Sequence, residues 1–328
     1  MNKISICSTS VLVVLFLSTF SASVMSSDLN RNPSETTSGG GWYFLPAYPN
    51  YAPQGLPDFD QKQDNWKAMQ GKWLLIGGLW SFCAPTSLAE IFWWFDSKHE
   101  DPLGYPGDGN DTYPLVRNYN TLGAPTPGPR LDDHNFNNVN DLETRWAQGR
   151  GAKELIEMLA WYCNTNFCRF PFVRGYAGTA ATFLEKGAKQ WIQDAGLQDH
   201  YTVEGIWKPD FSMIVERLHN NSGIILNLLL YNSNAILFQT FLGHYVAIAG
   251  INPNGSIALS DPFQNAANPS PTPIEHNNAN VVSYDVFSVN FTSPFPKKAS
   301  WWLMEYFDFG VKKFGGLAWY ALIISEIE

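Results

Sequence analysis

The sequence predicts an α+β fold in which N-terminal helices pack on an antiparallel sheet. Apolar residues recur at helical spacing in the first half of the chain, whereas short apolar strands fill the second half. Helices that precede strands, rather than alternate with them, favour α+β over a doubly wound sheet. Only 16% of the 328 residues are charged and 15% are aromatic, which is typical of a globular chain with a large core and excludes a disordered one.

Four helices are expected. The clearest covers about 83–97, where apolar residues recur at helical spacing and Pro85 lies in the first turn, a position that tolerates proline. The other three are predicted over 151–162, over 179–195 and from Asp210 onward. Residues 98–137 are rich in Gly, Pro, Asn and Asp, which indicates long loops.

Six strands are expected after the helices. Each is a short run of apolar and β-branched residues bounded by turn formers. They cover 223–231, 243–251, 256–260, 281–289, 300–307 and 318–325.

The N-terminus is predicted to be a secretory signal peptide over residues 1–26. Lys3 precedes an apolar stretch of roughly ten residues, and small residues follow it. The alternative is an uncleaved anchor. Residues 27–60 are expected to form an extended lead-in, and 61–328 a single domain. No uncharged apolar run of about 18 residues follows residue 30, so we expect a secreted, extracellular protein without a membrane span after cleavage.

The net charge of the chain and the spacing of its possible metal ligands argue against two classes of function, nucleic-acid binding and metal binding. The net charge of −9 argues against a phosphate-binding surface and therefore against nucleic acid as a partner. Asp132, Asp133 and His134 are interpreted as a solvated loop, because no second His or Cys pair lies at metal-ligand spacing. We expect neither a metal nor a cofactor.

Cys83 follows a Gly-containing loop and begins the first predicted helix. The N–H groups of a first helical turn lack intrahelical partners, and the helix dipole is positive there. Both effects stabilise a thiolate, the form in which cysteine is a nucleophile. A buried cysteine that serves only as a small apolar side chain is the alternative interpretation.

His244 and Asp261 lie on one predicted hairpin. If Asn252 pairs with Gly255 across a two-residue loop, residue 248 lies opposite 259 and residue 246 opposite 261. Asp261 is then a diagonal neighbour of His244 on the same face, ~7–8 Å away at Cα and within reach of a side-chain contact. An aspartate that accepts from the imidazole would orient it and favour its protonated form. The alternative is a core histidine with Asp261 as a turn residue.

Together these segments resemble the papain-fold cysteine peptidases. The resemblance is carried by Cys-Ala-Pro-Thr-Ser at 83–87, Trp-Trp-Phe-Asp-Ser at 93–97, Gly-His-Tyr at 243–245 and Ser-Asp-Pro at 260–262. The bacteriocin-leader-processing peptidases and their free-standing secreted relatives are the most similar branch. The Trp-Trp-Phe-Asp run is also similar to the secreted immunoglobulin-cleaving bacterial cysteine peptidases.

The resemblance implies a nucleophile at Cys83, a general base and acid at His244, and an orienting carboxylate at Asp261. The family usually has a Gln about six residues before the cysteine as an oxyanion-hole donor, and this chain has Gly77 there. The candidates to replace it are Gln70, Lys72 and the Trp80 indole, beside the Cys83 backbone N–H. A missing donor would cost ~10²–10³ in rate.

Cys163 and Cys168 are predicted to form a disulfide. On one regular helix their Cα atoms would stand ~8 Å apart, too far to bridge. The Asn-rich residues between them indicate a turn, which brings such a pair to ~5.5 Å. Secretion supplies an oxidising compartment, and Cys83 is then the one unpaired cysteine after residue 26.

The sequence therefore predicts a secreted cysteine peptidase that acts on a peptide or protein by acyl transfer through a thiolate. A transglutaminase-like acyltransferase with the same three residues is one alternative. A non-catalytic surface or carbohydrate-binding module on a decayed peptidase fold is another, which the absent Gln favours.

Overall fold

The computed structural model describes residues 41–48, 55–59, 61, 80–99, 112–116, 155–169, 177–231, 242–263, 284–308 and 313–327. The helices in these ranges are α1 (Cys83–Lys98), α3 (Leu155–Tyr162), the 3-10 helix η1 (Thr165–Phe167), α4 (Ala181–Asp194) and α5 (Phe211–His219). The strands are β1 (Tyr43–Phe44), β2 (Tyr201–Trp207), β3 (Gly223–Tyr231), β4 (Leu242–Asn252), β5 (Ser256–Ser260), β6 (Tyr284–Asn290), β7 (Trp302–Asp308) and β8 (Lys313–Glu326).

The strands form one antiparallel sheet that closes on itself. Its order is β4-β3-β8-β7-β6-β5, and β5 pairs with β4 again, so the six strands form a ring. β1 adds to the second half of β4, and β2 to the second half of β8. The mixed helix and sheet architecture confirms the α+β prediction, including an antiparallel sheet.

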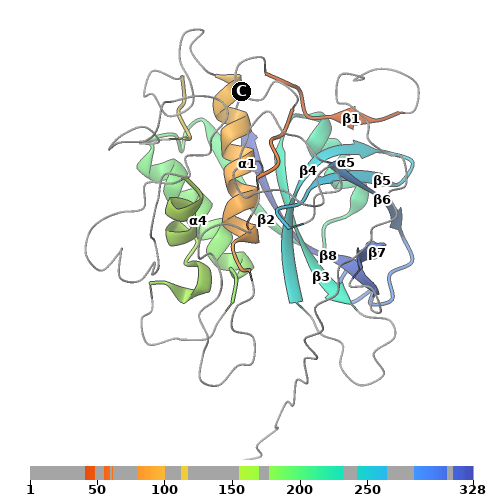
Figure 1. Ribbon diagram of the computed structural model, residues 1–328. Coiled ribbons are helices and arrows are strands. Elements are labelled where there is room, and N and C mark those ends of the chain that lie inside the picture. The colour runs from red at the N-terminus through yellow and green to blue at the C-terminus, as the bar shows by residue number, and fades with distance from the viewer. Residues whose placement is uncertain are drawn as a thin grey trace, which may run out of the picture.

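Helix α1 lies between the sheet and the helices α3 and α4 (Figure 1). All its residues from Cys83 to Ser97 are buried, the acidic Glu90 and Asp96 included. Polar groups hold it in place: the Trp94 indole donates to the Pro46 carbonyl at 2.8 Å, and Asp96 accepts from the Leu115 and Val116 amides. These contacts anchor the C-terminal half of α1.

The β4–β5 hairpin has the predicted strand register at Ile248, but its turn is one residue longer than predicted. Asn252 pairs with Ser256 across three residues, and not with Gly255 across two. A bulge between Ile248 and Gly250 then shifts the ladder by one residue, so that Ile248 lies opposite Leu259 as predicted. The bulge compensates for the longer turn and leaves His244 and Asp261 on the same face.

Two strands are not anticipated by the sequence pattern. β1 is only two residues long, and β2 combines exposed polar positions with Gly205. The glycine is explained by packing: a Cβ there would lie 2.3 Å from both the Tyr320 hydroxyl and the Glu185 carboxylate. Close packing against α4 therefore favours a residue that sequence patterns associate with turns.

The predicted Cys163–Cys168 disulfide is wrong, because the structure has thiols at both positions. The chain does turn after α3, with Asn164 and Asn166 at positive φ. However, the two side chains point to different partners. Cys163 packs against Gly187 of α4, whereas the Cys168 thiol donates to the Ala160 carbonyl at 3.8 Å.

The predicted signal peptide, 1–26, lies outside the described residues. The described parts of the lead-in, 41–48 and 55–59, pack on the domain through β1 and through buried Leu45, Leu56 and Phe59. In the part of the chain that the structure describes, no helix combines the length and the apolar character that a membrane crossing requires.

Candidate active site

Cys83 occupies the first position of α1, directly after Phe82. The Thr86 amide and hydroxyl both donate to the Phe82 carbonyl, at 3.0 and 2.8 Å, which closes the first turn. No side chain caps this helix end, and Pro85 has no N–H, so the Cys83 and Ala84 amides are the donors left at the positive end. Cys83 is 7% exposed, which places its thiol at the edge of the core.

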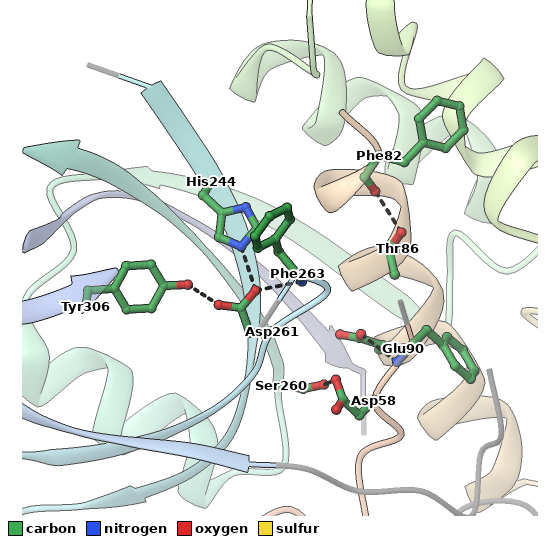
Figure 2. Close-up of polar contacts among 10 residues, drawn as sticks. Asp58, Phe82, Thr86, Glu90, His244, Ser260, Asp261, Phe263 and Tyr306 are labelled. Carbon is green, nitrogen blue, oxygen red and sulfur yellow. Dashed lines mark hydrogen bonds and ion pairs between the residues drawn. The ribbon is translucent and has the colours of Figure 1, made fainter. Parts of the chain in front are cut away.

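His244 projects from β4 toward this turn of α1 (Figure 2). Its Nε2 lies 2.6 Å from Asp261 Oδ1, and the Cys83 side chain lies within electrostatic reach of the imidazole. Because Nε2 is engaged by the aspartate, Nδ1 is the ring nitrogen left for the thiol. The imidazole therefore bonds the carboxylate on one side and keeps a nitrogen for the cysteine on the other.

Asp261 directly follows β5 and is 1% exposed. In addition to His244, it accepts from the Phe263 amide at 2.9 Å on Oδ1 and from the Tyr306 hydroxyl on Oδ2 (Figure 2). Donors on both oxygens hold the carboxylate plane in place, and the carboxylate in turn orients the imidazole.

Electrostatics favour a charged pair of His244 and Asp261. Burial alone would lower the pKa of His244, but the Asp261 carboxylate and the Cys83 thiol outweigh it and raise the pKa to about 10. Burial alone would raise the pKa of Asp261, but His244 and then the donors of Tyr306 and Phe263 hold it below its usual range. At neutral pH the pair is an imidazolium and a carboxylate.

Aromatic rings surround the imidazole. The ring centroids of Phe263, Tyr306 and Phe307 lie 6.4, 6.4 and 5.9 Å from that of His244. These side chains keep water away from the His244–Asp261 contact, which strengthens it electrostatically.

A second buried polar cluster lies behind the aspartate, between α1 and β5 (Figure 2). The Ser260 hydroxyl lies 3.1 Å from both the Pro57 carbonyl and Asp58 Oδ1, and the Phe59 amide donates to Glu90 Oε1 at 3.1 Å. Burial, and next the nearby charge of Asp58, raise the pKa of Glu90 well above its ordinary value. Glu90 is therefore a neutral acid that joins the 57–59 segment to α1.

The structure thus brings Cys83, His244 and Asp261 together. Gln70 and Lys72 lie outside the described residues, and Trp80 is half-buried against the core three residues before Cys83. Sequence patterns did not indicate Tyr306 or Glu90. The one available signal for Glu90 was the presence of two acidic residues, Glu90 and Asp96, in a helix rich in apolar residues, since a buried carboxyl requires a partner.

The described residues contain no group of three or more His, Cys, Asp or Glu side chains placed to hold a metal ion. Residues 132–134, interpreted from the sequence as a solvated loop, lie outside them.

Comparisons with known proteins find only distant similarity. No family model matches the sequence, and no curated protein matches it. Among solved structures, it is similar to the active wild-type interpain A cysteine protease of Prevotella intermedia, with 13% identity over 85% of this chain and 97% of that one and a TM-score of 0.39. A mutant fragment of prointerpain A, from the same organism, shows 14% identity over 85% and 74% of the two chains and a TM-score of 0.34. Similarity this low supports no assignment of function. Any such assignment depends on the geometry of the site.

Proposed function

We propose that this protein is a cysteine peptidase of the papain-like fold, in the bacteriocin-leader-processing-like branch that its motifs resemble. Cys83, His244 and Asp261 would hydrolyse peptide bonds. The observation that carries the proposal is the position of the His244 imidazole, held by Asp261 on Nε2 and facing the thiol at the uncapped start of a buried helix. A histidine that served only the core would not need a cysteine at a helix terminus on its other side.

The reaction would proceed by acyl transfer in two stages. The Cys83 thiolate attacks the carbonyl carbon of the scissile peptide, and His244 gives its proton to the departing amine. Water then attacks the thioester, His244 removes a proton from it, and the acid product leaves as Cys83 is regenerated. No oxidant, reductant or further reactant is required.

Backbone amides at the start of α1 support the oxyanion. The Cys83 N–H points out of the first turn, where the helix dipole is positive. The second oxyanion-hole donor would come from Gln70, Lys72 or the Trp80 indole. The substrate would be a peptide or protein outside the cell, since the predicted signal peptide directs the chain to secretion.

The test is hydrolysis of a mixed peptide library by the purified protein, before and after treatment with iodoacetamide. We expect cleavage that disappears when Cys83 is alkylated, and peptide mapping that shows label on Cys83. The matched controls are Cys83→Ala, which should be inactive, and Cys163→Ala, which should be active because Cys163 packs against Gly187. No cleavage of any peptide by the untreated protein would contradict the proposal. Products joined to an added amine, in place of hydrolysis, would instead identify an acyltransferase.

A further inference from the structure

A short segment at the end of the lead-in reaches the chain on both sides of Asp261. This bracing segment, residues 56–59 and 61, lies about 200 residues before the aspartate in the sequence. On the side that precedes Asp261, the Ser260 hydroxyl lies 3.1 Å from both the Pro57 carbonyl and Asp58 Oδ1. Figure 2 shows this contact beside the carboxylate that orients the imidazole.

The second contact lies on the side that follows Asp261. The Gln61 amide donates to the Pro262 carbonyl at 2.9 Å. The bracing segment is itself held in place, because all its residues are buried and the Tyr284 hydroxyl donates to the Leu56 carbonyl at 2.9 Å. Both chain neighbours of Asp261 are therefore bonded to one buried segment.

The place of Asp261 in the fold explains why such contacts matter. Strand β5 ends at Ser260, in its ladder with β4 as well as in its ladder with β6. Asp261 therefore lies one residue beyond the paired part of the sheet, where a chain is less constrained than within a strand. The carboxylate nevertheless has to remain 2.6 Å from His244 Nε2. Contacts from outside the sheet supply the missing constraint on the backbone.

We propose that the bracing segment positions Asp261 for catalysis, and that Ser260 and Gln61 are the positioning residues through which it does so. The proposal rests on the proposed peptidase function. Neither residue would touch the substrate: each fixes the backbone beside Asp261, Asp261 orients the His244 imidazole, and the imidazole transfers the proton. Loss of either contact should therefore lower kcat and leave KM unchanged.

A segment with a purely structural role would contribute to the free energy of unfolding and leave the proton affinity of His244 unchanged. A segment that positions Asp261 also keeps the carboxylate against the imidazole, so its loss should lower the pKa of His244 from about 10 toward the ordinary value of 6.5. The alkaline limb of kcat/KM follows this pKa, because the reaction needs an imidazolium. The titratable groups that face His244 are Asp261 and Cys83, and those that face Asp261 are His244, Tyr306 and Glu90. All of them are unchanged when the bracing contacts are removed.

The experiment measures kcat, KM and the pH dependence of kcat/KM for Ser260→Ala, with the best library peptide as substrate. Tyr284→Phe is the matched control, because it also removes one hydroxyl bonded to the bracing segment, at Leu56, which lies away from Asp261 in the chain. We expect Ser260→Ala to lower kcat about three- to tenfold, in line with the loss of one hydrogen bond. Its alkaline limb should move to lower pH by about half a unit, which corresponds to a contact between imidazolium and carboxylate that is about threefold weaker. Tyr284→Phe should keep the kcat and the limb of the wild type, although both variants should unfold at a lower temperature.

A second pair of variants tests the contact on the other side of Asp261. Gln61→Pro removes the N–H that donates to the Pro262 carbonyl, whereas Gln61→Ala keeps this N–H and loses only the side chain. The Pro variant should reproduce the lower kcat and the shifted limb of Ser260→Ala, and the Ala variant should not. Circular dichroism verifies that each variant folds, and the Gln61 pair decides the question if Ser260→Ala does not fold.

The pH dependence of the rate at which iodoacetamide alkylates Cys83 responds to the same imidazolium without any peptide. It should shift in the same direction in Ser260→Ala and in Gln61→Pro. A kcat and an alkaline limb equal to those of the wild type in these folded variants would overturn this inference alone. A wild-type protein that cleaves no peptide would instead overturn the proposed function, and the alkylation profiles would then decide whether the bracing segment positions Asp261.

Discussion

Two buried cysteines of this protein lie at opposite ends of neighbouring helices. Cys83 begins α1 and meets an imidazole, whereas Cys163 follows the last residue of α3 and packs against Gly187. Burial raises the pKa of Cys163, which keeps it a thiol. A helix C-terminus presents carbonyl oxygens, and these disfavour a thiolate. Helix polarity and the adjacent base therefore distinguish the proposed nucleophile from a cysteine that only fills the core.

Two buried carboxyl groups show the same contrast. Asp261 accepts from His244, Phe263 and Tyr306, and these donors keep it ionised. Glu90 accepts one backbone amide and faces the negative charge of Asp58, so it holds a proton. Both groups are excluded from water to a similar degree. The number of donors and the sign of the nearest charge decide between the two states.

The largest expected effect tests the contrast between Cys83 and Cys163. Cys83→Ala should abolish hydrolysis because it removes the attacking atom, and His244→Ala should come close to it. Cys163→Ala should retain activity and lose about 1 kcal/mol of stability from a small cavity. Hydrolysis rates and thermal unfolding check this. Full activity in Cys83→Ala would show that the nucleophile is another residue.

The second-largest expected effect is a change in the pH dependence of kcat/KM when Asp261 is replaced. Asp261→Asn removes the charge that raises the pKa of His244, so that pKa should fall from about 10 toward the ordinary value of 6.5. Because the reaction needs an imidazolium to protonate the leaving amine, the alkaline limb of kcat/KM should move to lower pH. The maximum should fall by on the order of 10²-fold, since the imidazole is also less well oriented. An unmoved alkaline limb would contradict the assigned role of Asp261.

The Glu90→Gln variant tests whether Glu90 is protonated in the folded chain, and the quantity measured is the free energy of unfolding. In the folded chain Glu90 keeps its proton, whereas in the unfolded chain it ionises above its ordinary pKa of 4.5. The wild-type free energy of unfolding therefore falls as pH rises above 4.5, by about 1.4 kcal/mol for each unit by which the folded pKa is raised. Gln mimics the protonated acid and still accepts from Phe59.

Denaturant unfolding at pH 4 and pH 7 measures this difference. The variant should match the wild type at pH 4 and exceed it at pH 7. The groups that face Glu90 are Asp58, Ser260 and Asp261, and all three are unchanged in the variant. A variant less stable than the wild type at pH 7 would mean that Glu90 is ionised.

The smallest expected effect is that of Tyr306→Phe. The change removes one of the donors to Asp261 and leaves the ring that lies beside His244. The pKa of Asp261 should rise slightly, and kcat/KM should fall by about two- to tenfold, in line with the loss of one hydrogen bond to a charged group. Steady-state kinetics check it, with the same alkaline limb as the wild type. A loss as large as that of Asp261→Asn would assign Tyr306 a direct part in the reaction.

Local chemistry in the sequence determined much of this protein. The start of α1 at Cys83 follows from Pro85 and from apolar spacing, and the strands 223–231 and 256–260 have the predicted bounds. The pairing of His244 with Asp261 follows from alternation on a hairpin, because a one-residue error in the turn is cancelled by a bulge in β4.

Only the tertiary structure decided the rest, because it depends on contacts between distant residues. Tyr306 reaches Asp261 through the closure of the sheet, and Asp58 approaches Glu90 because the 57–59 segment packs between α1 and β5. The separation of Cys163 from Cys168 follows from the packing of α3 on α4. No local pattern encodes such contacts, since each depends on which surfaces the folded chain brings together.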